Sequence, residues 1–141
     1  MQRNASAVWQ GGLKQGQGTV STESGVLNEA QYSFGTRFEE GTGTNPEELL
    51  GAAHAGCYSM ALSLVLGESG ITPERIDTTA NVTIEPSDDG FTITAVHLYV
   101  NARIPDIDEA AFQEAANAAK EGCPVSKLFN AEITLETNLL Q

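Results

Sequence analysis

The chain has 141 residues, of which 40% are hydrophobic, and this size is typical of one domain with an ordinary core. Its formal net charge is −12, from 19 acidic and only 7 basic residues. A field of this sign repels phosphate backbones and anionic lipid surfaces, so the composition argues against nucleic acid and membrane partners. The first residues lack an apolar stretch of signal-peptide length, and no segment is expected to span a bilayer. We therefore expect a soluble cytoplasmic protein.

The first part of the chain, residues 4–38, holds short segments of alternating polarity. The glycine-rich residues 11–18 lie between two of these segments and predict a hairpin turn, and a later segment is Gln31 to Phe34. This pattern predicts an antiparallel meander. Residues 41–44, Gly-Thr-Gly-Thr, predict a flexible loop that leads into a helix.

That helix has a strong predicted start. Asn45 is a suitable N-cap, Pro46 suits the first helical position, and Glu48 completes an Asn-x-x-Glu capping box. Small and apolar residues then continue along a wide face to residue 67. Gly51 and Gly56 would weaken an exposed helix, so we expect a central helix that another backbone approaches closely.

The second half mixes strands and helices again. Residues 78–84 alternate in polarity, and residues 91–100 change phase, which predicts a β-bulge or a strand covered on both faces. Asp108 can cap a helix that stops at Gly122, and residues 133–139 predict a closing strand. This order of elements predicts an α+β fold and not a doubly wound sheet. The apolar side of the later helix is expected to comprise Ala111, Phe112, Ala115, Ala116 and Ala119.

The only two thiols of the chain are Cys57, in the small-residue helix, and Cys123, between Gly122 and Pro124. Without a signal peptide, a structural disulfide is a poor default. Both thiols can instead be buried small apolar side chains, but their settings favour thiol chemistry. Cys123 is expected at a helix N-terminus, where backbone N–H groups and the helix dipole lower a thiol pKa.

A reactive cysteine needs positive charge or oriented donors nearby, because the thiolate is the nucleophile. Among the 7 basic residues, Arg37 is the leading candidate, although an arginine between Phe34 and Phe38 is also typical of a packed surface. Its planar fork can pair with a carboxylate while it faces a thiolate. Glu47, in the first helical turn, is the candidate carboxylate, although acidic residues favour helix N-termini in any case.

The spacing of two of these residues bears on quaternary structure. Glu47 and Cys57 are ten positions apart, a rise of about 15 Å along a straight helix. They cannot touch within one unbroken helix. Either the helix bends at Gly51 or Gly56, or Glu47 comes from a second subunit. We favour the second subunit, because the small-residue face suits a close dimer contact.

Two other classes of protein stay open from the residues alone. A cysteine hydrolase would pair Cys57 with His54, but a rigid neighbour on the same helix is poorly oriented to accept the thiol proton. A non-catalytic, stress-induced ligand-binding dimer would use the same core with inert thiols. His54 and His97 make no recognisable metal-ligand spacing with the cysteines, so we expect no metal site.

Five stretches of the sequence form a recognisable set: GTVSTESGVL (residues 18–27), TRF (36–38), TNPEELLGAAHAGC (44–57), GCPVS (122–126) and AEITL (131–135). Together they resemble the OsmC/Ohr family, the osmotically induced and organic-hydroperoxide-resistance proteins, and are most similar to its OsmC branch. The resemblance covers nearly the whole chain. One departure is Gly56, where the family usually has alanine.

The resemblance implies a single OsmC-like domain over residues 1–141, with antiparallel sheets wrapped around long central helices in an intertwined homodimer. It implies a thiol peroxidase with Cys57 as the peroxidatic cysteine, Cys123 as the resolving cysteine, and Arg37 and Glu47 as the activating pair. Two sites would lie at the subunit interface, with no metal or prosthetic group. The expected role is oxidative and osmotic stress defence, with a dithiol reductant of the lipoyl type.

Sulfur chemistry gives the expected reaction. The Cys57 thiolate attacks a peroxide, and the sulfenic acid condenses with Cys123 to a disulfide that a dithiol reopens. Apolar surroundings, expected from Tyr58, Met60 and the aromatic neighbours of Arg37, favour organic peroxides over hydrogen peroxide.

Overall fold

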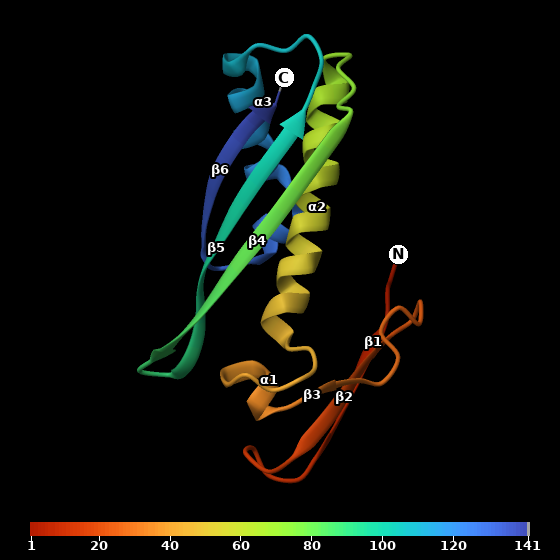
Figure 1. Ribbon diagram of the computed structural model, residues 1–141, viewed down its shortest axis with the longest axis vertical. Coiled ribbons are helices and arrows are strands. Elements are labelled where there is room, and N and C mark those ends of the chain that lie inside the picture. Colours follow the sequence, from red (N-terminus) through yellow and green to blue (C-terminus); the bar gives the residue numbers. More distant parts are fainter. Residues whose placement is uncertain (141) are drawn as a thin grey trace. The chain divides into compact units, whose positions relative to one another are not determined.

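The computed structural model describes residues 1–140, which form two compact units (Figure 1). The first unit comprises residues 1–49 and the second begins at residue 50. Each unit is described by itself. The mixture of helices with two small sheets confirms the predicted α+β class.

The first unit is built on a three-stranded antiparallel sheet in the order β1-β2-β3. Its strands are β1 (Ala5–Gln10), β2 (Gln17–Thr22) and β3 (Ala30–Tyr32), so the predicted meander is confirmed. A short helix, α1 (Phe34–Phe38), follows where the sequence predicted a continuing strand. The strand ends there because Ser33 and Thr36 form a capping box, with each side chain bonded to the backbone N–H of the other.

The long helix α2 (Pro46–Glu68) begins in the first unit and continues into the second. The backbone N–H of Glu48 donates to Oδ1 of Asn45 over 2.8 Å, which confirms the predicted N-cap. The Glu48 carboxylate does not complete the predicted box in the expected way, because it accepts a hydrogen bond from Thr44 Oγ1. The helix is unbroken from Pro46 to Glu68.

The two glycines of α2 differ in their surroundings. A Cβ added at Gly51 would lie 3.4 Å from the Ala80 carbonyl oxygen, so the predicted close backbone approach is confirmed there. An added Cβ at Gly56 would meet no described atom within 4 Å, so this chain itself provides no close approach at Gly56. The physical reason is that Gly56 lies on the exposed side of the helix.

The expectation that no segment is long and apolar enough to span a bilayer is wrong. Helix α2 has 23 residues and a mean hydropathy of 1.5 in its most apolar window, which is long and apolar enough to cross a bilayer. The reason is that residues 49–67 contain no Asp, Glu, Lys or Arg, so small and apolar residues form one uncharged stretch of helix. The central helix of a soluble protein satisfies the same criterion.

The second unit contains a sheet in the order β4-β5-β6. Strand β4 (Arg75–Ser87) pairs antiparallel with β5 (Gly90–Arg103), and β5 pairs parallel with β6 (Glu132–Leu140). The β4–β5 register shifts where Thr83 faces Ala95 and Ile84 faces Ile93, so Thr94 is the extra residue of a β-bulge. The bulge predicted from the phase change is therefore confirmed.

Helices α2 and α3 (Glu109–Gly122) and the short α4 (Pro124–Leu128) complete this unit. Asp108 caps α3 through a 2.7 Å bond from the Ala111 N–H, as predicted, although the Ala111 side chain is exposed and does not join the apolar face. Alternate residues of β5 are buried together with α2 and α3 residues, so both helices pack on one face of the sheet. The core residues include Tyr58, Leu62 and Leu66 of α2, Val96, Leu98, Val100 and Ala102 of β5, and Phe112, Ala115 and Ala119 of α3.

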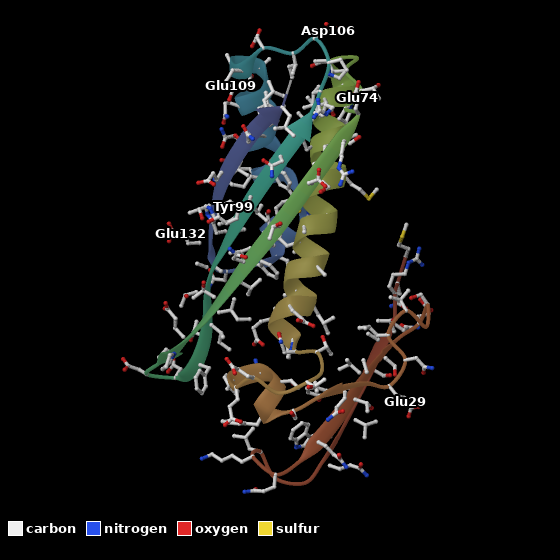
Figure 2. The ribbon with its side chains drawn as sticks, in the orientation of Figure 1. Glu29, Glu74, Tyr99, Asp106, Glu109 and Glu132 are labelled. Carbon is white, nitrogen blue, oxygen red and sulfur yellow. The ribbon has the colours of Figure 1, made fainter. Side chains whose placement is uncertain are left out.

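The surface of the second unit carries much of the acidic charge. Figure 2 shows Glu74, Asp106, Glu109 and Glu132 on the outside of this unit, and all four side chains are exposed. Charged groups of one sign in full contact with water favour solubility and repel polyanions.

Candidate active site

The two cysteines lie together in the second unit. Cys57, in the middle of α2, and Cys123, between α3 and α4, have their Sγ atoms 2.9 Å apart as free thiols. Cys57 is partly exposed, whereas Cys123 is fully buried. The structure thus brings together two predicted site residues that are 66 positions apart in sequence.

Local sequence explains the position of Cys123. Its backbone N–H donates to the Ala119 carbonyl and closes α3, while its own carbonyl accepts from Lys127 and opens α4. Pro124 follows at the first helical position, where its missing N–H costs no hydrogen bond. The prediction of a thiol at a helix N-terminus is confirmed, and the helix, α4, ends at Leu128.

The electrostatic setting of Cys57 works against the thiolate. Burial raises the pKa of the Cys57 thiol, and the contact with Cys123 raises it further. The backbone N–H of Val125, in the first turn of α4, donates to the Cys57 sulfur and lowers the pKa. No cation is among the groups that shift this pKa. Within the second unit, the surroundings of Cys57 therefore favour its neutral thiol over its thiolate.

An arginine–carboxylate pair occupies the first unit. Arg37 Nε donates a hydrogen bond to Oε1 of Glu47 over 2.9 Å, and Arg37 Nη2 lies 2.7 Å from the same oxygen in an ion pair. The Glu47 side chain is buried, and its other oxygen has no described hydrogen-bond partner. The Arg37 guanidinium also lies over the Phe38 ring, 5.2 Å from its centre. The predicted pairing of Arg37 with Glu47 is present as an ion pair, and both of its residues belong to the first unit.

Asn45 explains why the two partners meet. Its Oδ1 caps α2, which carries Glu47, and its Nδ2 donates to the Thr36 carbonyl in α1, which carries Arg37. One amide therefore links the end of the short helix to the start of the long one. The arginine side chain remains partly exposed, with 37% of its surface accessible.

His54 makes a buried contact that was not predicted from the sequence. This residue is fully buried, and its Nε2 lies 2.7 Å from Ser126 Oγ. Its Nδ1 has no described partner, and burial lowers the pKa of the imidazole. The ring is committed to Ser126 on α4, so the structure does not support a hydrolase in which His54 activates Cys57. The helical spacing placed His54 near Cys57, but no sequence signal pointed to Ser126.

Tyr58 and Met60 do not line a substrate site in the expected way. Tyr58 is fully buried, and its hydroxyl donates to the Ala116 carbonyl, so it belongs to the core. Met60 is 78% exposed on the outer side of α2. The apolar surroundings predicted for the peroxide therefore do not come from Tyr58.

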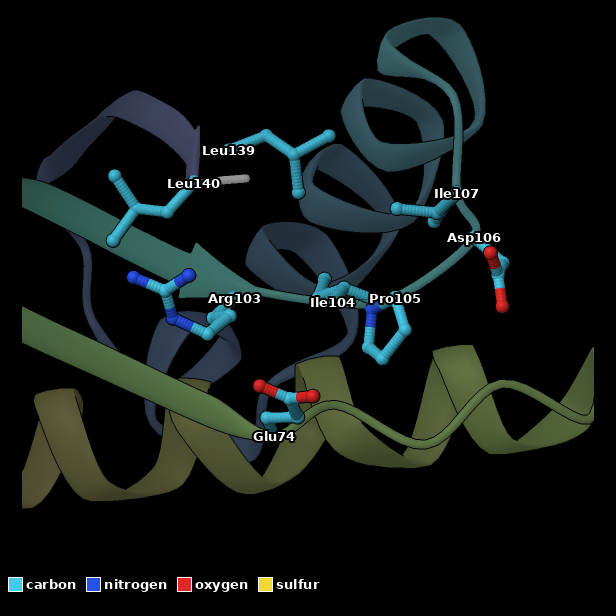
Figure 3. Close-up of a pocket in the computed structure, with 8 residues that line it drawn as sticks. All are labelled: Glu74, Arg103, Ile104, Pro105, Asp106, Ile107, Leu139 and Leu140. Atoms are coloured by element: carbon cyan, nitrogen blue, oxygen red, sulfur yellow. The ribbon is translucent and has the colours of Figure 1, made fainter.

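A hollow of about 380 Å³ lies elsewhere in the second unit, where the ends of β5 and β6 meet the start of β4 (Figure 3). Its lining includes Glu74, Arg103, Asp106 and Leu139, and neither cysteine.

These features define an α+β protein in which a partly exposed cysteine thiol on a long helix contacts a buried cysteine thiol between two other helices. Residues 39–138 match the model of the OsmC-like protein family. The chain is 56% identical over 137 residues to Peroxiredoxin OsmC of Escherichia coli (strain K12), covering 97% of this chain and 96% of that protein. The chain belongs to the OsmC-like family, and the resemblance inferred from the sequence is confirmed.

A second relative supports the same family. The chain is 35% identical over 123 residues to the organic hydroperoxide resistance protein OhrB of Bacillus subtilis (strain 168), covering 86% of this chain and 88% of that protein. The crystal structure of OhrB from Bacillus subtilis has a TM-score of 0.74 and 31% sequence identity, covering 96% of this chain and 98% of that one. An OsmC-like protein from Mycoplasma pneumoniae, at 16% identity and a TM-score of 0.76, shows the same fold.

Proposed function

We propose that this chain is a thiol-dependent peroxidase that reduces organic peroxides, and hydrogen peroxide less well, in oxidative and osmotic stress defence. The observation that carries the proposal is the 2.9 Å contact between a partly exposed and a fully buried thiol. The prediction of a cysteine-based peroxidase is confirmed at family level by relatives named for peroxiredoxin activity and organic hydroperoxide resistance.

In the proposed cycle, the Cys57 thiolate attacks one peroxide oxygen and the O–O bond breaks. The leaving oxygen takes a proton and departs as alcohol or water, while Cys57 becomes a sulfenic acid. The Cys123 thiol then forms the S–S bond, and its proton leaves with the hydroxyl of Cys57 as water. A dithiol reductant, of which the lipoyl type is one candidate, reopens the disulfide by exchange and is itself oxidised.

Arg37 is proposed to favour the Cys57 thiolate, with Glu47 aiming the guanidinium. The raised pKa of Cys57 within its own unit supports a need for this cation. Arg37 contacts a single Glu47 oxygen through Nε and Nη2, so Nη1 is left to face a sulfur or a peroxide oxygen. The unbroken α2 gives no support to the alternative in which the helix bends between Glu47 and Cys57.

A homodimer is proposed because α2 has an outer side that the chain itself does not cover. Gly56, Met60 and Leu64 lie on this side, and Met60 and Leu64 are 78% and 66% exposed. Exposed apolar surface on a strongly acidic, otherwise polar chain favours a protein partner over a lipid one. In the same proposal, the second subunit supplies Glu47 to the site. The protein is also proposed to be soluble and cytoplasmic.

The proposal is tested by peroxide consumption with hydrogen, cumene and fatty-acid peroxides, run with several dithiols, alongside sedimentation of the intact protein. Turnover with an organic peroxide that depends on a dithiol is expected, at the mass of a dimer. A chain that consumes no peroxide with any of these dithiols would contradict the proposal.

A second candidate, a non-catalytic ligand-binding dimer with inert thiols, is favoured by one observation, the raised pKa of Cys57. Titration of Cys57 in the intact protein separates the two candidates. An activated thiol titrates below its ordinary value near 8.5, whereas an inert buried thiol does not.

A further inference from the structure

Besides the thiol contact, a buried polar contact links α2 and α4. His54 Nε2 and Ser126 Oγ are 2.7 Å apart, with His54 fully buried and Ser126 only 9% exposed. His54 lies three residues before Cys57, and Ser126 lies three residues after Cys123. The two contacts are therefore neighbouring links between the same helices, about one helical turn apart.

The surroundings of His54 leave this contact as its main polar anchor. Its Nδ1 has no described hydrogen-bond partner, and its ring meets the Phe129 ring edge-on, 5.3 Å between centres. An imidazole with one unpaired buried nitrogen depends strongly on the bond made by the other. Both Ser126 and Phe129 belong to α4 or its C-terminal cap, so this histidine is directed at α4 and not at the sulfur of Cys57.

Helix α4 needs such an anchor. It has only five residues, too few to be stable by itself, and Ser126 is the only residue in it that is described as buried. Cys123 precedes it directly, and the Val125 N–H that donates to the Cys57 sulfur lies within it. Any displacement of α4 therefore moves both the resolving thiol and a donor to the reacting sulfur.

We propose that His54 and Ser126 form a positioning pair that holds α4 so that Cys123 reaches the Cys57 sulfenic acid quickly. This inference rests on the proposed function, in which that step expels water and forms the disulfide. A misplacement of about 1 Å costs up to a hundredfold in rate. A slower Cys123 leaves the sulfenic acid exposed to a second peroxide, which oxidises it irreversibly to sulfinic acid.

The test compares Ser126→Ala and His54→Gln with Ser59→Ala as a matched control. Ser59 is also on α2, two residues after Cys57, and its hydroxyl lies 2.7 Å from Thr78 Oγ1, but it links α2 to β4 and not to α4. Two rates are measured in intact protein whose folding is verified by circular dichroism. They are sulfenic acid formation with cumene hydroperoxide, by trapping and mass spectrometry, and disulfide closure.

Ser126→Ala is expected to slow disulfide closure about tenfold or more and to increase sulfinic acid on Cys57. Sulfenic acid formation should slow less than closure, because only one donor to the Cys57 sulfur, the Val125 N–H, moves with α4. Ser59→Ala is expected to leave both rates unchanged, and Ser126→Thr, which keeps the hydroxyl, to restore closure. Wild-type closure in folded Ser126→Ala would overturn the inference, and so would equal slowing by Ser59→Ala, because general loosening would then explain the effect.

A second oxidant separates the two proposals. Diamide forms the Cys57–Cys123 disulfide without any peroxide: one thiolate adds to its N=N bond, and the second thiol attacks the sulfur of this adduct and releases diamide as its reduced hydrazine. The rate of the second step, measured from the adduct by mass spectrometry, reports positioning. If Ser126→Ala slows closure by diamide while wild type does not react with peroxides, the positioning pair stands and the peroxidase proposal fails. If wild type turns over peroxides and Ser126→Ala closes normally with both oxidants, only the positioning pair fails. Should Ser126→Ala not fold, His54→Gln and Ser126→Thr provide the same comparison.

Discussion

The sulfur atoms of Cys57 and Cys123 lie 2.9 Å apart, yet only Cys57 is accessible to solvent. This difference in burial supports the different roles proposed for two residues of identical chemistry. A peroxide from solvent meets Cys57 first, whereas Cys123 is sheltered and can react only with its neighbour.

Cys57→Ser is expected to remove peroxidase activity completely, because the remaining thiol is fully buried and a serine hydroxyl does not replace a thiolate. The measurement is peroxide consumption with a dithiol present. Cys123→Ser is the matched control, since it removes the other thiol and should still allow one oxidation. Continued turnover in Cys57→Ser would exclude this residue as the peroxidatic cysteine.

Cys123→Ser is expected to permit a single oxidation of Cys57 and then to stall or overoxidise it. Without the neighbouring thiol, the sulfenic acid has no intramolecular partner and moves on to sulfinic acid. Intact mass spectrometry should show added oxygen on Cys57 and no disulfide. Normal steady-state turnover with a lipoyl-type dithiol would mean that Cys123 is not required for resolution.

Arg37→Ala and Glu47→Ala are expected to slow peroxide attack ten- to a hundredfold, about 1.4 to 2.8 kcal/mol of barrier. Losing Arg37 removes the cation that is proposed to lower the pKa of Cys57, so this pKa should rise, whereas losing Glu47 leaves the guanidinium misaimed. Stopped-flow rates and thiol titration report these two effects. Arg75→Ala is the matched control, because Arg75 also pairs with a carboxylate, Asp77, but on an exposed strand. Equal losses in Arg75→Ala would point to a general charge effect.

Subunit mixing tests where Glu47 acts. If Glu47 serves the partner subunit, heterodimers of inactive Glu47→Ala and Cys57→Ser chains should regain activity, since one site then combines an intact Glu47 with an intact Cys57. The activity of purified heterodimers, isolated with two different tags, is the measurement. Heterodimers that stay inactive would place both residues in the same chain.

His54 is expected to make stability depend on pH. Burial lowers the pKa of His54 below its ordinary 6.5, so the unfolded chain binds a proton that the folded chain does not. The stabilisation is therefore present above about pH 6.5 and is lost as the pH falls toward the lowered pKa, with a slope of at most about 1.4 kcal/mol per pH unit.

The measurement is urea unfolding of wild type and His54→Gln at equal protein concentration, at about pH 7.5 and about pH 5.5, on either side of the unperturbed value. The advantage of wild type over the variant should shrink at the lower pH. His97→Gln, which removes the half-buried second histidine, is the control. A difference that does not vary with pH would mean that His54 titrates equally in the folded and unfolded chains.

Gly56→Ala is expected to weaken the dimer. Within this chain an added Cβ meets nothing, so alanine should stabilise the helix by up to about 1 kcal/mol. If a second α2 packs against this side, the same methyl group separates the two helices, and the dissociation constant measured by sedimentation rises. Gly122→Ala, at the end of α3, is the control, because an added Cβ there also meets nothing. Unchanged dimerisation would remove Gly56 from the proposed interface.

Several elements could be predicted from local signals alone. The caps at Asn45 and Asp108 and the phase change that marks the bulge at Thr94 each act within a few residues, so their patterns are visible in the sequence. The helix α1 was not predicted because it depends on the Ser33–Thr36 capping box, and its five residues are too few to show a helical periodicity of apolar residues. The family resemblance identified Cys57, Cys123, Arg37 and Glu47 as candidates, but their catalytic roles stay predictions.

Residue identity and spacing were thus sufficient for the class of fold, the starts of the long helices and the choice of candidate site residues. Packing between distant segments was needed for the contact between Cys57 and Cys123, the raised pKa of Cys57 and the bond between His54 and Ser126. The physical reason is range. Caps and turns depend on neighbours along the chain, whereas burial, desolvation and side-chain contact depend on which surfaces the whole unit brings together.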